Sequence, residues 1–330
     1  MGNPRPKSAT ATPSPPPSLG GRGGRSLALH RFAVLTAIAT LGLIFAGGLV
    51  TSTESGLSVP DWPLSYGRLM PPMVGGVRYE HGHRMVATAV GILTVILAIW
   101  LARREPRRWV RRLGYLAVAA VVAQGVLGGL TVLFLLPTGI SVAHACLAQT
   151  FFCLVTVIAV VTSPRWEAGT VSEPVTRLSA LAASAAFLQL LIGAVMRHTR
   201  AGLAIPDFPL SLGRVVPRLD SFPVAIAFAH RAWALVVAAL VAATLGAAFR
   251  SGRRGLRRTA VALGVVVIVQ IALGATTVLS RKSVAVTTAH VATGALLLGT
   301  SVALAVGARS RRRLTVVPAQ PVEGKAGAWK

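Results

Sequence analysis

The stretch EHGHR at residues 80–84 lies where a polar loop runs into a long apolar segment, and half of it returns later in the chain. The second copy reads AHR at residues 229–231, again at the start of an apolar segment. The histidine and the arginine recur, whereas the residue that matches Glu80 is Ala227. Ionisable side chains are costly at the mouth of a membrane span, so the stretch is a candidate functional site.

The composition is that of an integral membrane protein. Of the 330 residues 53% are hydrophobic and only 13% are charged, and the mean hydropathy is +0.66. Soluble domains carry more charge than this. Several uncharged apolar runs reach the roughly 20 residues that a helix needs to cross a bilayer. The sequence therefore predicts an all-α, multi-pass protein that lies in the lipid bilayer of the cell membrane.

The positive charge gathers in the connections between the apolar runs. The formal net charge of +25 comes mainly from arginine clusters, among them the links at 103–112 and 250–258. Basic clusters in short connections are typical of the cytoplasmic side of a membrane protein. We therefore predict that both termini are cytoplasmic and that the two long loops face outward. We expect no nucleic-acid partner, because a basic groove needs a soluble face to lie on.

Eight spans and an internal repeat organise the chain. The expected spans are 32–50, 82–102, 113–135, 140–162, 177–197, 223–249, 259–279 and 284–308. GLSVPDWPLSYGR at 56–68 matches GLAIPDFPLSLGR at 202–214, and QGVLGGLTVL at 124–133 matches QIALGATTVL at 270–279. Because each half has an even number of spans, the repeat predicts two tandem, pseudo-symmetric four-helix bundles with the same orientation in the membrane.

The expected domain boundaries follow from the repeat. A disordered, basic, proline-rich tail at 1–27 precedes an N-terminal half at 28–163. A C-terminal half at 164–308 precedes a basic cytoplasmic tail at 309–330. The only cysteines, Cys146 and Cys153, lie in one span and about 10 Å apart along its axis, which is too far for a disulfide. We interpret them as small buried apolar side chains.

Each half carries one histidine near the start of its second span and one near the start of its fourth. The pairs are His83 with His144 and His230 with His290. Measured from the outer end of its span, each of the four lies at a predicted depth of roughly 6–10 Å. A lone histidine is more often a hydrogen-bonded interface residue, but two matched pairs with spacings of 61 and 60 residues favour a haem iron between them. Zinc is disfavoured because a pair offers too few ligands.

Several cations recur at the level where the propionates of a haem would emerge. We predict propionate contacts for them, with lipid head groups as the open alternative; they are Arg68, Arg84, Arg214 and Arg231. Arg197 and His198 are further candidates for propionate or partner contacts. His30 and His81 have no histidine at the matching position of the other half, and we interpret them as loop or interface residues.

Glu80 breaks the symmetry of the two halves. It lies three residues before His83, one helical turn outward on the same face. Two equivalent electron-transfer sites would both carry the carboxylate or both lack it. We infer that the N-terminal half performs proton or carbocation chemistry while the C-terminal half holds a haem that relays electrons. The alternative is an acid that only favours the helix dipole.

Taken together, these residues resemble the haem A synthase family, the membrane enzymes that oxidise the C8 methyl of haem O to a formyl group. The resemblance covers about residues 30–308. It rests on the repeated Gly-Leu-x-x-Pro-Asp-x-Pro-Leu loop and on Glu80-x-x-His83-Arg84, His144, Arg197-His198-Thr199, His230-Arg231 and His290.

The resemblance implies an activity and assigns the two halves. It implies that His230 and His290 ligate a haem b cofactor and that His83 and His144 hold the substrate haem O. From the position of the histidines near the outer ends of their spans, we expect both sites near the outer leaflet. Glu80 falls on the glutamate that the family needs for activity. The family reaction is two successive hydroxylations of one methyl followed by loss of water, and it serves cytochrome oxidase biogenesis. Expected partners are haem O synthase and an electron acceptor, and a homo-oligomer is left open.

One departure and one alternative accompany the resemblance. Many members carry cysteine pairs in the outer loops, whereas the matching positions here are Val59, Ser65, Ile205 and Ser211. The chain therefore resembles a subgroup without loop cysteines, in which no thiol–disulfide step operates. The alternative function is a dihaem b-type membrane electron carrier, which has no use for Glu80. A transporter is disfavoured, because the spans offer few polar residues for a path through the membrane.

Overall fold

A computed structural model of the chain describes residues 26–164, 166 and 173–310. In this part of the chain the structure is helical and no strand forms; in the loops, isolated β-bridges join Ser65 to Arg68 and Ser211 to Arg214. Eight helices are long and apolar enough to cross a membrane. They are α1 (Leu27–Ser52), α2 (Val77–Arg104), α3 (Arg108–Leu133), α4 (Thr138–Thr162), α5 (Glu173–His198), α6 (Phe222–Arg250), α7 (Arg254–Leu279) and α8 (Val284–Ala308), with the short 3-10 helix η1 (Ala201–Leu203) after α5. The prediction of an all-α, multi-pass membrane protein with eight spans is confirmed.

Most helices begin earlier than the hydropathy indicated. α1 begins at Leu27, inside the expected tail, because Ser26 caps it by accepting a hydrogen bond from the backbone N–H of Leu29 at 3.3 Å. α2 begins at Val77, so Glu80 lies in its first turn and not in the loop. Polar residues at the membrane boundary lower the hydropathy without interrupting the helical hydrogen bonds. The tails expected at 1–27 and 309–330 otherwise lie outside the described residues.

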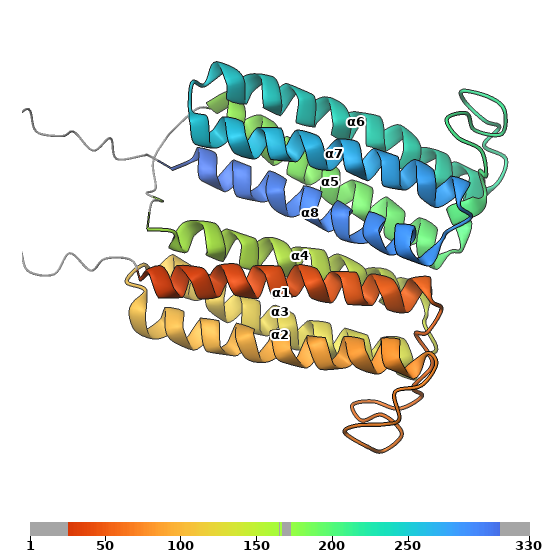
Figure 1. The fold of residues 1–330 in the computed structure, drawn as a ribbon, viewed down its shortest axis with the longest axis horizontal. Helices are drawn as coiled ribbons and strands as arrows, with labels where there is room; N and C mark the ends of the chain where they lie inside the picture. The colour runs from red at the N-terminus through yellow and green to blue at the C-terminus, as the bar shows by residue number, and fades with distance from the viewer. Residues whose placement is uncertain (1–25, 165, 167–172, 311–330) are drawn as a thin grey trace, which may run out of the picture.

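The helices form two groups of four (Figure 1). In the first group α1 and α3 each pack on both α2 and α4, and in the second α5 and α7 each pack on both α6 and α8. Hence α2 and α4 stand diagonally across the first group, and α6 and α8 stand diagonally across the second. These diagonal helices carry the four paired histidines of the sequence.

Small residues bring the two groups together. α8 packs on α1 and α4, and α4 also packs on α5. Phe152 of α4 lies so close to α8 that a Cβ added at Gly299 would stand 2.6 Å from its ring. Gly48 of α1 faces Val291 of α8 in the same way, at 3.4 Å. Lipid is as apolar as a leucine side chain, so helices in a bilayer associate mainly through such close packing.

The connections differ between the two ends of the helices. Figure 1 shows that α1 begins and α8 ends at one end, where the links from α2 to α3 and from α6 to α7 also lie. The loops at 53–76 and 199–221 lie at the opposite end. Because α2, α4, α6 and α8 all begin at this loop end, their N-terminal turns carry all four paired histidines to a similar level.

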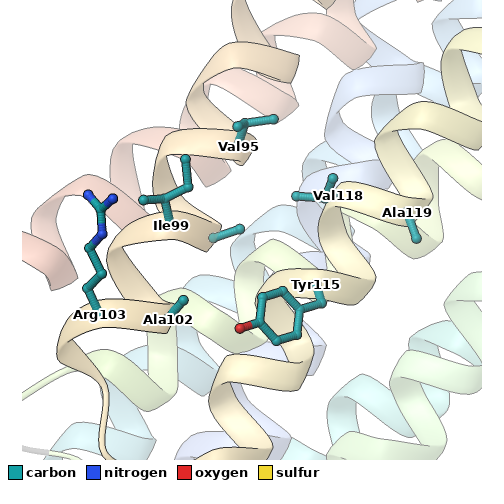
Figure 2. Close-up of a pocket in the computed structure, with 8 residues that line it drawn as sticks. Val95, Ile99, Ala102, Arg103, Tyr115, Val118 and Ala119 are labelled. Atoms are coloured by element: carbon teal, nitrogen blue, oxygen red, sulfur yellow. The ribbon is translucent and has the colours of Figure 1, made fainter.

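One groove lies on the face of the first group that is turned away from the second group, and it is distant from the histidines. It has a volume of about 510 Å³ and runs between α2 and α3 (Figure 2). Arg103 and Tyr115 are its polar lining residues, and the rest are the apolar side chains Val95, Ala98, Ile99, Ala102, Val118 and Ala119. Arg103 belongs to the last turn of α2, whereas His83 lies near the start of that helix. The groove is therefore not part of the candidate site.

Candidate functional site

The paired histidines approach each other across the interior of each group. The rings of His230 and His290 have their centroids 6.5 Å apart, with an angle of 72° between their planes. A metal ion held at about 2 Å from a nitrogen of each of two imidazoles would place their centroids roughly 6 Å apart. The spacing therefore fits two axial ligands of one iron. In the first group, His144 is close enough to His83 to act on it electrostatically.

The ring nitrogens offer unused coordination positions. Among the described residues, the buried Nδ1 atoms of His83, His144 and His290 have no hydrogen-bond partner. Buried polar atoms are normally paired, so these orphaned nitrogens call for a ligand. No cluster of three or more His, Cys, Asp or Glu side chains forms in the described part of the chain. The donor set consists of imidazole pairs, and such pairs fit the axial positions of a haem iron.

Each of the four imidazoles lies against a glycine of the preceding helix. A Cβ added at any of these glycines would stand 3.0–3.2 Å from the Cε1 atom of a histidine. Any larger residue would push the ring away, so glycine permits the close approach of ring and backbone. We call these four positions the glycine seats: Gly47 for His83, Gly128 for His144, Gly193 for His230 and Gly274 for His290.

Glutamines support the histidines beside the seats. Gln124 donates from Nε2 to the carbonyl oxygen of His144 at 3.0 Å and lies 3.3 Å from its ring Nε2. Gln189 donates to the carbonyl oxygen of His230 at 2.9 Å and lies 3.2 Å from its ring Nδ1. Each glutamine precedes a glycine seat by four residues and hence shares its helix face.

The seats and the glutamines were missed in the sequence. A signal was present, because the repeated segments QGVLGG and QIALGA each contain Gln-x-x-x-Gly. A glycine in an apolar helix has many uses, however, and hydropathy does not reveal which helix face meets a histidine. Only the packing of α3 on α4 and of α7 on α8 identifies these glycines as seats.

Arg84 and Arg231 hold the long loops onto the helices. Arg84 donates to the carbonyl oxygens of Asp61 and Leu64, both at 2.8 Å. Arg231 donates to the carbonyl oxygens of Ile205 at 2.8 Å and Leu210 at 2.9 Å. The structure therefore gives these two cations loop contacts that the sequence did not reveal.

Glu80 gives the first loop hydrogen bonds that the second loop lacks. The side chain of Glu80 is 5% exposed. Its Oε1 accepts from Arg84 at 2.8 Å, and its Oε2 accepts from the backbone N–H of Val59 at 2.9 Å. His81 adds a contact of 2.8 Å between its Nδ1 and the hydroxyl of Ser65. Ala227 provides no such acceptor in the second half, so the carboxylate is specific to the first loop.

An aspartate builds the tight turn in each loop. The carboxylate of Asp61 accepts from the backbone N–H groups of Tyr66 at 2.7 Å and Gly67 at 2.8 Å. The N–H groups of Gly67 and Tyr66 lower the pKa of Asp61, because they stabilise its charged form. Asp207 accepts in the same way from Leu212 and Gly213, both at 2.8 Å, and these N–H groups lower its pKa too.

The other predicted propionate contacts lie in different surroundings. Arg68 and Arg214 are exposed on the loops. Arg197 is partly buried and reaches across to α1, where its Nη2 donates to the carbonyl oxygen of Gly48 at 3.1 Å and to the hydroxyl of Ser52 at 3.0 Å. Its neighbour His198 ends α5. Arg197 thus places a cation between the two helix groups, near the loop end.

The remaining histidine lies at a helix interface, and both cysteines are free. The Nδ1 atom of His30 contacts the carbonyl oxygen of Ala159 at 3.0 Å, so His30 joins α1 to α4 as an interface residue. Cys146 and Cys153 are free and partly buried. Among the buried residues of the long loops are Val59, Ser65, Ile205 and Ser211.

Comparison with known proteins adds a family and several relatives. The family described as "Cytochrome oxidase assembly protein" matches residues 30–75 and 77–302. A haem A synthase of Halalkalibacterium halodurans is 33% identical over 283 residues, which cover 79% of this chain and 92% of the relative. One of Symbiobacterium thermophilum is 34% identical and covers 73% of this chain and 82% of the relative. One of Rhizorhabdus wittichii is 27% identical, with coverages of 87% and 93%.

Proposed function

This chain belongs to the cytochrome oxidase assembly protein family, and we propose that it acts as a haem A synthase, a membrane oxidoreductase that converts haem O to haem A. The observation that carries the proposal is the facing pair of imidazoles in the second group, with ring centroids 6.5 Å apart. Histidine pairs on facing helices are a common way to hold a haem in a four-helix bundle. The similarity to haem A synthases extends over most of both chains.

The two helix groups would share the work. We assign a haem b cofactor to His230 and His290, and the substrate haem O to His83 and His144. When bound, the haem b supplies one-electron transfer, which the oxidation of a methyl group requires. In each group the glycine seats let the rings enter the bundle interior, and a glutamine bonds to one of the two histidines, Gln124 to His144 and Gln189 to His230. The long loops, held by Arg84 and Arg231, lie at the same end of the helices as the histidines.

Glu80 would give the first group its reactivity. Its carboxylate lies one turn before His83, and the second group has only Ala227 at that position. A buried carboxylate there stabilises a developing cation at the methyl carbon or accepts the proton of an attacking water. Its hydrogen bonds from Arg84 and from the N–H of Val59 hold the carboxylate in place beside the first loop.

A substitution of Glu80 separates catalysis from loop anchoring. Glu80→Gln keeps an oxygen that accepts from the loop but removes the charge. We expect this variant to bind both haems and to form no formyl-bearing haem. Undiminished haem A production by Glu80→Gln, with both haems bound, would rule out the catalytic role.

Among the candidate cations, Arg197 has the surroundings that best fit a contact with a haem propionate. It lies between the helix groups with no carboxylate bonded to it among the described residues, and a buried cation is stable only with anionic or polar partners. We propose that Arg197, together with His198, contacts a haem propionate. Arg84 and Arg231 keep this role as a prediction beside their loop contacts, as do the exposed Arg68 and Arg214.

The membrane setting and the partners complete the proposal. We place the chain in the cell membrane, with the loop end and the haem sites at the outer leaflet and the basic links in the cytoplasm. Haem O synthase and an electron acceptor are the proposed partners. The deciding experiment is co-expression with a supply of haem O, followed by mass analysis of the haems bound to the purified protein. Bound haem b together with a formyl-bearing haem is expected, and bound haem b alone would favour a dihaem electron carrier.

A further inference from the structure

We propose that Ser141 and Thr287 each donate a hydrogen bond to a propionate carboxylate of the haem held in their own helix group. The inference rests on the proposed function. It assigns a role to two buried hydroxyl groups for which the described residues provide no hydrogen-bond partner.

Buried hydroxyl groups in these spans usually bond to their own helix. A serine or threonine inside a helix can donate to the carbonyl oxygen of the residue four positions earlier, and in a bilayer this satisfies the hydroxyl without a partner from another helix. The buried residues that do so are Thr36, Thr40, Thr94, Thr162, Ser179, Thr244 and Ser301.

Ser141 and Thr287 depart from this pattern. Ser141 is 3% exposed, and no described residue is a hydrogen-bond partner of its Oγ. The Oγ1 atom of Thr287 is also buried and orphaned. A third orphaned hydroxyl, that of Thr288, belongs to a side chain that packs against Gly48 of α1, at the contact between the two groups. Buried polar atoms are normally paired, so the hydroxyls of Ser141 and Thr287 call for a partner.

Both hydroxyls lie one helical turn outward from a proposed haem ligand. Ser141 precedes His144 by three residues in α4, and Thr287 precedes His290 by three residues in α8. Residues three apart share one face of a helix. The two hydroxyls also occupy matching positions of the internal repeat, at the offset of 146 residues that relates His144 to His290. Each helix group therefore has one orphaned hydroxyl at the same place beside its histidine pair.

A feature that both groups share points to a chemical group that both haems share. The position three residues before the first histidine of each pair differs between the groups, because it is Glu80 in one and Ala227 in the other. The position before the second histidine carries a hydroxyl in both. The edge of haem b bears methyl, vinyl and propionate groups, and of these only the propionates accept hydrogen bonds. A hydroxyl common to both groups therefore fits a propionate better than it fits the reacting methyl.

The surroundings of both hydroxyls favour an anion. Each belongs to the fourth residue of its helix, where the helix dipole is positive. The N-cap residues of α4 and α8 offer no side-chain acceptor to the first backbone N–H groups. Arg197 is close enough to His290 to act on it electrostatically, and His198 acts in the same way on His144. Each group thus has a further polar side chain near the ligand beside which its hydroxyl lies.

Removal of each hydroxyl should speed the release of the haem in its own group. Thr287→Val and Ser141→Ala delete the hydroxyls with little change of shape. Each purified variant, with its haems bound, is mixed with apomyoglobin in excess, and the transferred haems are separated by chromatography with time. We expect Thr287→Val to release haem b, and Ser141→Ala to release haem O or haem A, roughly tenfold faster than the parent, because a hydrogen bond to a charged group is lost. Thr287→Ser keeps a hydroxyl and should keep the rate of the parent.

A chemical change of the haem tests the carboxylate itself. The protein is produced in haem-deficient cells and loaded with haem b or with its dimethyl ester, in which both propionates are uncharged. Because hydrogen bonds to charged groups are stronger than those to neutral groups, we expect Thr287→Val to accelerate the release of haem b much more than that of the ester. An equal acceleration for both would show that the hydroxyl supports the fold of the site and not the propionate, and would overturn the inference.

Matched controls distinguish the possible failures. Ser301→Ala in α8 and Thr162→Val in α4 remove buried hydroxyls that bond to their own helix, and both should leave the release rates unchanged. Release at the rate of the parent in both Thr287→Val and Ser141→Ala, with both haems present at the start, would overturn the inference and leave the proposed function intact. If the parent protein binds no haem b, the proposed function itself fails. Because the two variants act on different groups, misfolding of one leaves the other as a test.

Discussion

At the scale of single residues, the site depends on its glycines as much as on its histidines. A histidine in a membrane span needs a defined rotamer before it can serve as a ligand, and here the backbone of a neighbouring helix supplies one wall of its pocket. The glycine seats make this contact possible at four places. Without Gly193, for example, the ring of His230 could not lie this close to the neighbouring helix.

Substitution of a glycine seat should therefore remove haem without unfolding the protein. In Gly193→Ala the new Cβ would stand 3.0 Å from Cε1 of His230, so the ring must shift by a few tenths of an ångström. We expect the content of haem b to fall severalfold, measured by the absorbance of the purified protein. Gly307→Ala in α8, with no atom within 4 Å of the new Cβ, is the matched control and should keep its haem. Equal haem contents in the two variants would contradict the role of the seat.

Because of the aspartate in its turn, each loop should lose stability only at acidic pH. Hydrogen bonds from Gly67 and Tyr66 lower the pKa of Asp61 in the folded loop. The carboxylate therefore stabilises the loop fully above its unfolded pKa of about 3.9, and this contribution is lost as the pH falls through the lower folded pKa. We expect constant resistance to proteolysis between pH 5 and 8 and a decline only below about pH 4.

Asp61→Asn tests this account by removing the charge. The amide keeps one acceptor oxygen and loses the other, so we expect faster cleavage of the first loop at pH 7 as well as in acid. Asp220→Asn, at an exposed position in the second loop, is the control. If the loop of the Asp61→Asn variant resists the protease as well as the parent loop does, the carboxylate does not hold the turn.

At the scale of elements, each long loop is attached to the helix that follows it by one arginine. A guanidinium presents several donors in a plane and so serves several carbonyl oxygens at once, which an ammonium group does less well. Arg84 joins the loop at Asp61 and Leu64 to the carboxylate of Glu80. Arg231 makes the loop contacts without a carboxylate, so the second loop depends on fewer bonds.

Replacement of these arginines should loosen the loops to different extents. We expect Arg84→Lys to lower the free energy of opening of the 53–76 loop by about 1.5–3 kcal/mol, the range for hydrogen bonds to charged groups. Arg231→Lys should act less strongly on the 199–221 loop, because Arg231 makes fewer hydrogen bonds than Arg84. Hydrogen exchange of the loop amides measures both. A larger effect of Arg231→Lys than of Arg84→Lys would contradict this ranking of the two arginines.

The sequence predicted the elements well and their contacts less well. Eight apolar runs and an offset of 146 residues were enough to anticipate the helices and the matched pairs such as His144 and His290. The hydrogen bonds of Arg84 to loop carbonyls were not predictable. Every residue has a backbone carbonyl, so the sequence does not show which of them will accept a hydrogen bond. The helix starts were placed late for a related reason, since hydropathy registers side chains and not the backbone hydrogen bonds that define a helix end.

At the scale of the whole molecule, the paired histidines of both helix groups lie near the same end. This follows from four helices in each group, which return the chain to its starting side before the second group begins (Figure 1). Two haems held at similar depth in neighbouring groups would lie side by side in one leaflet, with Arg197 of the second group reaching α1 of the first between them. Such an arrangement suits electron transfer between the groups.

The orientation of the whole molecule can be tested by labelling. The native Cys146 and Cys153 are first replaced by alanine, and single cysteines are introduced at Leu69, which is 85% exposed in the first loop, or at the exposed Arg104 in the basic link. Because basic links stay in the cytoplasm, we expect a membrane-impermeant maleimide to label Leu69→Cys in intact cells and Arg104→Cys only after lysis. The opposite pattern would place the loop end and the proposed haem sites in the inner leaflet. The proposed partners, haem O synthase and an electron acceptor, would then have to act from the cytoplasmic face.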